Sequence, residues 1–243
     1  IENGQALVRR ETTVGDVTVR ASALDVRSIG AGGGSIAHVP ELTKALRVGP
    51  ESAGAVPGPA AYDKGGENPT VTDANVVLGY LPENQKLGGD MNIRKDLAEK
   101  AVQKVADALG LTVNEAAEGI VKIVNERMFG AVRLVSIEKG YDPRDFSLMA
   151  FGGAGPLHAN ALGELTQSWP VIVPPGPGIL CAYGDATTRL RNEASKTIIV
   201  NMKNADGGKI ATDLGEFAQS AGDGLTISGS NDAINLDTKT LEY

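Results

Sequence analysis

The run Phe146–His158, FSLMAFGGAGPLH, constrains the fold of this chain more than any other segment. An apolar stretch leads into a glycine-rich turn, and residues that favour a helix follow. Glycine has no Cβ, so the backbone can bend sharply there and a ligand can approach it closely. A helix that starts just after the turn offers unpaired N–H groups and a partial positive charge. The run therefore predicts a strand, a turn and a helix that either bind an anionic ligand such as a nucleotide or simply pack together.

A second glycine-rich turn has a similar character. It lies in the segment Ile29–Ile36, IGAGGGSI. Neither turn is specific by itself, because glycine-rich turns also serve packing alone. Two of them in one chain suggest a ligand held between two lobes.

The pattern of apolar residues and turns predicts an α/β fold with an at least partly parallel sheet, because strands and helices alternate along the chain. Residues 5–27 favour strands, with Gly15-Asp16 in a hairpin turn. Residues 40–75 are rich in loops, and prolines exclude residues 49–59 from a helix or a central strand. The remaining expected elements are helices at 92–109, 112–139 (with a Thr112–Glu115 capping box), 155–165, 178–189 and 214–220, and strands at 146–151, 170–173 and 197–200.

Three polar residues interrupt the apolar stripe of the second long helix: Asn125, Glu126 and Arg127. They form either a solvated face or the lining of a cleft. His158, on the first turns of a later helix, is expected to be packed or capping. Cys181 lies in an apolar segment and is expected to be buried.

Composition excludes several classes of function. The formal net charge of −7 without a basic stripe argues against nucleic-acid binding. The single cysteine excludes an internal disulfide and, with no apolar run long enough to span a membrane, favours a cytoplasmic protein. The 243 residues start at Ile1 within a strand-like segment and stop within another, so we expect a piece of a longer polypeptide.

Five motifs in order make the chain similar to the hydantoinase A/5-oxoprolinase family, over about residues 1–196. They are VRSIGAGGGSIA (26–37), LRVGPESAGA (46–55), PGPA (57–60), PTVTDAN (69–75) and FGGAGPLHA (151–159). The resemblance implies the actin, Hsp70 and sugar-kinase fold, with ATP between two ribonuclease-H-like lobes. Residues 1–200 would form part of one lobe, with an inserted loop region at 38–75, and residues 201–243 would start a C-terminal segment.

The same resemblance implies an activity. Members use ATP, with Mg²⁺, to open cyclic amides or imides such as 5-oxoproline, hydantoin or N-methylhydantoin, by phosphorylating a carbonyl or enol oxygen. Relatives instead activate acetone or acetophenone for carboxylation. A hydantoinase B-type subunit or domain is the implied partner. The chain could equally be a non-catalytic fragment of either enzyme.

Site residues follow from the matching motifs. The resemblance places Gly152, Gly153, Ala154 and Gly155 at the adenosine side, and Gly32, Gly33 and Gly34 at the cleft. It makes Asp25 and Asp73 candidate catalytic carboxylates. Asp25 could orient a nucleophile or hold Mg²⁺, or serve only as a turn or cap carboxylate. Asp73 could instead cap a helix at 74–78.

The chain also departs from the family's pattern. It lacks the two phosphate-binding loops that members carry before the position of Ile1, so as it stands it is not expected to turn over ATP. Arg27 replaces a histidine that many members have, and Ala61 replaces a cysteine. These changes put a metal or proton-transfer role at residue 27, and thiol chemistry at residue 61, in doubt.

Overall fold

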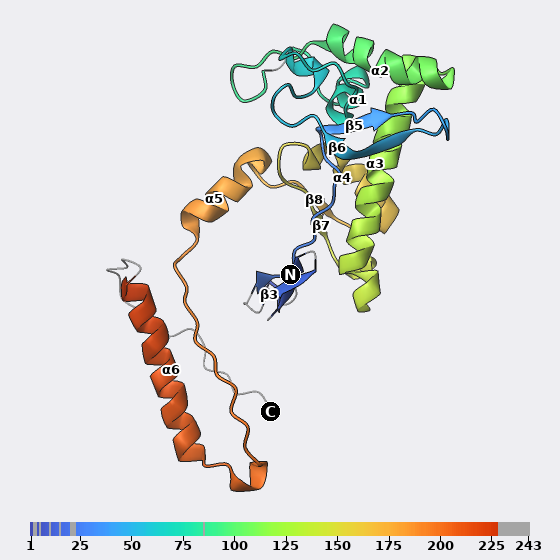
Figure 1. Cartoon of the computed structure of the whole chain (residues 1–243). Helices are drawn as coiled ribbons and strands as arrows, with labels where there is room; N and C mark the ends of the chain where they lie inside the picture. Colours follow the sequence, from blue (N-terminus) through green and yellow to red (C-terminus); the bar gives the residue numbers. More distant parts are fainter. Residues whose placement is uncertain are drawn as a thin grey trace. The chain divides into compact units, whose positions relative to one another are not determined.

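A computed structural model describes residues 1–227 except 2, 3, 5, 10, 15, 20–22 and 85 (Figure 1). The chain divides into two compact units, Ile1–Cys181 and Ala182–Tyr243. Every strand of the described part lies in the first unit. The boundary expected at residue 200 stays a prediction.

The chain begins with two nested antiparallel pairs. β1 (Val8–Arg9) pairs with β4 (Ala23–Leu24), and β2 (Thr12–Val14) pairs with β3 (Val17–Val19). Val14 lies opposite Val17, which confirms the expected hairpin. Gly15 of its turn lies outside the described residues.

A third antiparallel pair follows the first glycine turn. β5 (Ser35–His38) pairs with β6 (Arg47–Ser52), with Ala37 opposite Val48. Pro50 is tolerated within β6 because each strand of a two-stranded sheet is an edge strand, where a missing N–H need not break a ladder. The exclusion of residues 49–59 from a helix or a central strand is thus confirmed.

Helices form the core of the first unit. α1 (Val71–Val77) packs against both α2 (Lys95–Leu109) and α3 (Val113–Val135), and the 3-10 turn η1 (Ala60–Tyr62) lies beside them (Figure 1). The apolar stripes of α2 and α3 point inward, as their spacing predicts. The buried apolar residues of this cluster include Val71, Val76, Val102, Val105, Ala106, Ala117, Ile120 and Val124.

The ends of these helices follow the sequence signals. The Thr112–Glu115 capping box forms as expected, with the Thr112 hydroxyl accepting from the Glu115 N–H and the Glu115 carboxylate accepting from the Thr112 N–H. Gly110 ends α2 with a φ of 68°, a left-handed conformation that favours glycine. α1 begins before the expected residue 74, because Thr70 caps it.

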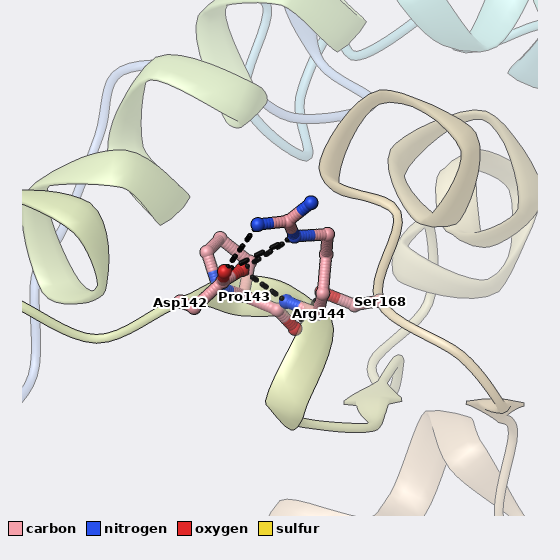
Figure 2. A network of polar contacts seen from close by, with 4 residues as sticks. All are labelled: Asp142, Pro143, Arg144 and Ser168. Atoms are coloured by element: carbon pink, nitrogen blue, oxygen red, sulfur yellow. Dashed lines mark hydrogen bonds and ion pairs between the residues drawn. The ribbon is translucent and has the colours of Figure 1, made fainter.

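Polar contacts hold the segment after α3. Within the 3-10 turn η3 (Pro143–Asp145), the Arg144 side chain forks onto the Asp142 carboxylate, which lowers the Asp142 pKa to about 2 (Figure 2). The Ser168 hydroxyl donates to the Pro143 carbonyl oxygen at 2.8 Å. This bond ties the segment before β7 (Leu148–Met149) to the segment before β8 (Val171–Ile172).

The run that opened the sequence analysis folds into a βαβ unit. β7 and β8 pair in parallel, with Leu148 opposite Val171, and α4 (Gly155–Thr166) connects them. The expected partly parallel sheet is confirmed in this pair alone of the described strands. Both strands are shorter than the expected ranges 146–151 and 170–173.

The last part of the chain departs furthest from expectation. After α5 (Leu180–Thr187), residues 188–201 are without regular structure, so the expected strand at 197–200 is wrong: no described strand pairs with it. α6 (Gly207–Ile227) is much longer than the expected helix at 214–220. Cys181 is exposed, not buried. Of the helices described, none is long and apolar enough to cross a membrane.

Candidate functional site

The two glycine turns lie against each other. A Cβ built on Gly33 would come within 3.5 Å of the Ala154 Cβ and 2.8 Å of the Thr72 hydroxyl oxygen. Thr72 donates twice to the Gly33 carbonyl oxygen, from its N–H at 2.8 Å and from its hydroxyl at 2.9 Å. Three of the sequence motifs therefore meet at Gly33, where only a glycine fits without displacing a neighbour.

Both turns present backbone N–H groups that have no acceptor in the described part of the chain. Among the described residues, no carbonyl or side chain accepts from the N–H groups of Gly33, Gly34, Gly153, Ala154 or Gly155. The last three lie at the start of α4, where Ala154 has no side-chain oxygen to cap them. Unpaired N–H groups at a helix N-terminus bind anions readily. The two turns together form a surface suited to a phosphate-bearing ligand.

The loop after β8 lies against the second glycine turn. The Gly152 N–H donates to the Pro177 carbonyl oxygen at 2.8 Å. The glycine turn and residues 174–179 thus lie together at the carboxyl ends of two parallel strands. Open α/β sheets bind ligands in this position.

Arg127, in the polar stretch of α3, holds the strand that pairs with the segment after the first turn. The Arg127 guanidinium of α3 donates to the Val48 carbonyl oxygen in β6. Its Nη1 lies 2.9 Å from the place of a Cβ on Gly49, which also approaches the Gly30 carbonyl oxygen. The interruption of the apolar stripe at 125–127 was the signal for this contact.

Asp73 is buried, with no exposed surface, and its carboxylate is fully used. Its two oxygens accept from the Ala61 N–H at 2.8 Å, the Thr70 N–H at 2.9 Å, the Thr70 hydroxyl at 2.7 Å and the Ala60 N–H at 3.3 Å. Burial raises the Asp73 pKa, although these bonds oppose the rise. The contacts fit the capping alternative, with Asp73 closing a capping box with Thr70, and its catalytic role stays a prediction.

Asp25 lies between two cations. One of its oxygens is 2.9 Å from the Arg9 Nε and the other contacts the Lys139 Nζ. Its side chain is only 7% exposed, so it is a partly buried ion-pair residue in this state. Its catalytic role stays a prediction. Within the described residues, no group of three or more His, Cys, Asp or Glu side chains could hold a metal ion.

His158 is fully buried on α4, as expected for a packed residue. Its Nδ1 lies 2.7 Å from the Asn125 side-chain oxygen of α3, which places the proton on Nδ1, and Nε2 has no partner within the described residues. Burial lowers the His158 pKa, so the ring is neutral near pH 7. Asn125 therefore belongs to the packing between α3 and α4, and not to a solvated face.

Comparison with known proteins now adds the family. The sequence model of the family described as hydantoinase/oxoprolinase matches residues 1–194. The alpha subunit of caprolactamase from Pseudomonas jessenii is 46% identical over 180 residues, which are 74% of this chain and 26% of that protein. The gamma subunit of acetophenone carboxylase from Aromatoleum aromaticum is 46% identical over 170 residues, 69% of this chain and 23% of that one.

Solved structures agree with the sequence comparison. Nucleotide-free acetone carboxylase superposes with a TM-score of 0.78 at 28% identity, over 93% of this chain and 33% of that chain. The chain thus spans about a quarter to a third of the length of these three relatives. With the family match over four fifths of its length and two glycine turns in contact, the chain belongs to the hydantoinase/oxoprolinase family.

Proposed function

We propose that this chain is part of an ATP-dependent enzyme that hydrolyses a cyclic amide or imide. The observation that carries the proposal is the contact between the two glycine turns at Gly33 and Ala154, where both turns have N–H groups without an acceptor among the residues that the structure describes. The name of the caprolactamase relative, at 46% identity, supports an amide substrate. In this proposal the chain contributes to a ribonuclease-H-like lobe of the actin, Hsp70 and sugar-kinase type.

The residues of the turns fit a nucleotide. The N–H groups of Gly153, Ala154 and Gly155 would bind it at the start of α4, and Gly33 and Gly34 would face it from the first turn. ATP would supply the phosphoryl group that activates the substrate carbonyl. Thr72 holds the first turn through the Gly33 carbonyl oxygen, and Arg127 holds β6, which pairs with the strand after that turn. Among the described residues, the N–H groups of Gly33 and Gly34 have no acceptor.

The described carboxylates do not provide an evident Mg²⁺ site. Asp73 already accepts four hydrogen bonds and Asp25 is paired with two cations. Mg²⁺ would accompany the nucleotide and be held by its phosphates and by residues outside this chain. A catalytic role for Asp25 would require its release from Arg9 and Lys139.

A second function is favoured by particular comparisons. Acetone carboxylase superposes over 93% of this chain, and the acetophenone carboxylase subunit is as similar in sequence as the caprolactamase subunit. A subunit of an ATP-dependent ketone carboxylase is therefore the alternative. Both alternatives imply a partner subunit, for which we propose a hydantoinase B-type protein, because the relatives are themselves named as subunits.

The test uses the full-length source polypeptide with its partner subunit. Phosphate release from ATP is measured with 5-oxoproline, hydantoin, caprolactam, and acetone or acetophenone plus bicarbonate. We expect stimulation by a lactam or imide, with one ring opened per phosphate. Stimulation by a ketone only with bicarbonate would establish the carboxylase instead.

A matched pair of variants tests the site. Ala154→Asp places a carboxylate among the N–H groups and should lower ATP affinity at least about tenfold through charge repulsion. Ala186→Asp adds the same charge on the exposed surface of α5 and should leave ATP affinity unchanged. Equal ATP affinity of both variants would contradict the proposed site.

A further inference from the structure

A shallow groove lies apart from the glycine turns, between α3, α4 and the end of α1. Its volume is about 450 Å³. Apolar side chains contribute much of its lining, together with Tyr80, which is 56% exposed. The lining residues are Leu78, Tyr80, Glu118, Val121, Lys122, Asn125, Glu126, Ala161, Glu164 and Leu165.

The rim of the groove is acidic. Glu118 and Glu126 come from α3 and Glu164 from α4, against the single cation Lys122, so three negative charges minus one positive charge leave −2. All four side chains belong to exposed residues. None of them forms an ion pair with a described residue, and only Glu164 accepts a hydrogen bond, from Asn160 at 3.1 Å. These charges are available to an external cation.

The lining includes a buried polar side chain with a free donor. Asn125 is 8% exposed, and its oxygen is bonded to His158. Its Nδ2 has no hydrogen-bond partner among the described residues. The Asn125 Nδ2 is accessible to solvent, so it can donate to an acceptor placed in the groove. The acidic rim and this accessible donor both suit a ligand that carries positive charges and a hydrogen-bond acceptor.

We propose that this groove binds a basic amphipathic helix of a partner protein. A groove between two helices suits a third helix that lays its apolar face on Val121, Ala161 and Leu165. Lys or Arg side chains flanking that face would meet the three glutamates. A carbonyl or side-chain oxygen of the partner would accept from Asn125. The relatives that are named as subunits are consistent with such a partner.

Docking here would also contact the element that carries the second glycine turn. Asn125 holds His158 on α4, and α4 begins at Gly155. The docking proposal does not depend on nucleotide binding at that turn. It can therefore be tested without ATP, and its failure would leave the proposed function untouched.

The probe is a fluorescein-labelled 16-residue helical peptide of Leu, Ala and Lys with an apolar stripe, and binding to the full chain is measured by anisotropy. The controls are a scrambled peptide of the same composition and one with Glu in place of Lys. We expect the amphipathic basic peptide to bind at least about tenfold more tightly than either control, because only it matches both charge and apolar lining.

Matched variants locate the binding. A triple variant should weaken peptide binding about tenfold or more, because three attractive charge pairs with the peptide lysines become repulsive. It combines Glu118→Lys, Glu126→Lys and Glu164→Lys. A control triple variant makes the same charge change at exposed sites outside the groove and should weaken peptide binding less than about twofold. It combines Glu41→Lys, Glu67→Lys and Glu83→Lys. Lys122 is also exposed, and Lys122→Glu should strengthen peptide binding. Because a misfolded variant would not bind more tightly, this gain shows that the charge of the groove, and not misfolding, controls binding.

Three outcomes would overturn the proposal. Equal weakening by both triple variants would mean general attraction between opposite charges. A dimer of the chain in sedimentation that the groove variant dissociates would assign the groove to a second copy. Displacement of the peptide by spermine at equal concentration would indicate a site for small organic cations.

Discussion

At the scale of single residues, the candidate site depends on the absence of a Cβ at one glycine. Gly33 carries the contact between the turns because a Cβ there would meet both Thr72 and Ala154. Gly32, one residue earlier, has nothing within 4 Å of the corresponding position. Neighbouring glycines with the same appearance in the sequence therefore have different tolerance to substitution.

This difference gives a prediction about stability. Gly33→Ala should lower the free energy of unfolding by about 1–3 kcal/mol, the usual effect of overpacking, because the Thr72 hydroxyl at 2.8 Å is fixed by its bond to the Gly33 carbonyl. Gly32→Ala should change it by less than about 1 kcal/mol. Urea unfolding of both variants measures this. In a double-mutant cycle, Thr72→Ala should relieve part of the Gly33→Ala loss, and strictly additive losses would show that the predicted clash is absent.

The residues of the site were predicted to different degrees from sequence. Both glycine turns are visible as local patterns, because each needs a particular backbone. Their contact through Thr72, and the support from Arg127, depend on how α1 and α3 pack, which no local pattern specifies. Asp73 shows the same limit: its position was found, but whether it caps or catalyses depends on the N–H groups of Ala60 and Ala61, which lie more than ten residues earlier.

At the scale of elements, helices with capping signals were predicted well and short strands were not. α2 and α3 start and stop near the expected residues because capping, periodicity and glycine act within a few residues of each end. Strands depend on a neighbour, so the β-branched segment 197–200 looked like a strand and yet has no described partner. α6 extends through several glycines that lower helix propensity, which is why only 214–220 was expected.

The βαβ unit allows a prediction for α4. A Cβ on Gly163 would lie 2.4 Å from the Val171 Cγ2 of β8, so Gly163→Ala should destabilise the fold by about 1–3 kcal/mol despite the higher helix propensity of alanine. Gly130→Ala in α3 is the matched control, since nothing lies within 4 Å there, and it should stabilise by up to about 1 kcal/mol. Thermal and urea unfolding report both signs, and stabilisation by Gly163→Ala would contradict the close packing of α4 on β8.

At the scale of the whole molecule, parts of the chain differ in how much regular structure and buried core they contain. The first unit has the buried helical core of α1, α2 and α3. In the second unit, residues 188–201 are exposed and without regular structure, although Asn192 donates to the Ala221 carbonyl oxygen and the Lys196 ammonium lies over the Phe217 ring. Exposed backbone outside helices and strands opens readily to proteases.

Limited proteolysis should therefore cut first between α5 and α6. Trypsin has four sites there, at Arg189, Arg191, Lys196 and Lys203, and we expect a resistant fragment that ends at one of them, identified by intact-mass spectrometry. Cleavage within the core needs the helices to unfold and should be slower by orders of magnitude, because it requires most of the unfolding free energy. Replacing the four residues by Gln should remove the early fragment and leave the unfolding midpoint of the first unit unchanged. Early cleavage at Lys104 or Lys122 instead would mean that α2 and α3 are not the stable core, and the packing argued for the glycine turns would lose its support.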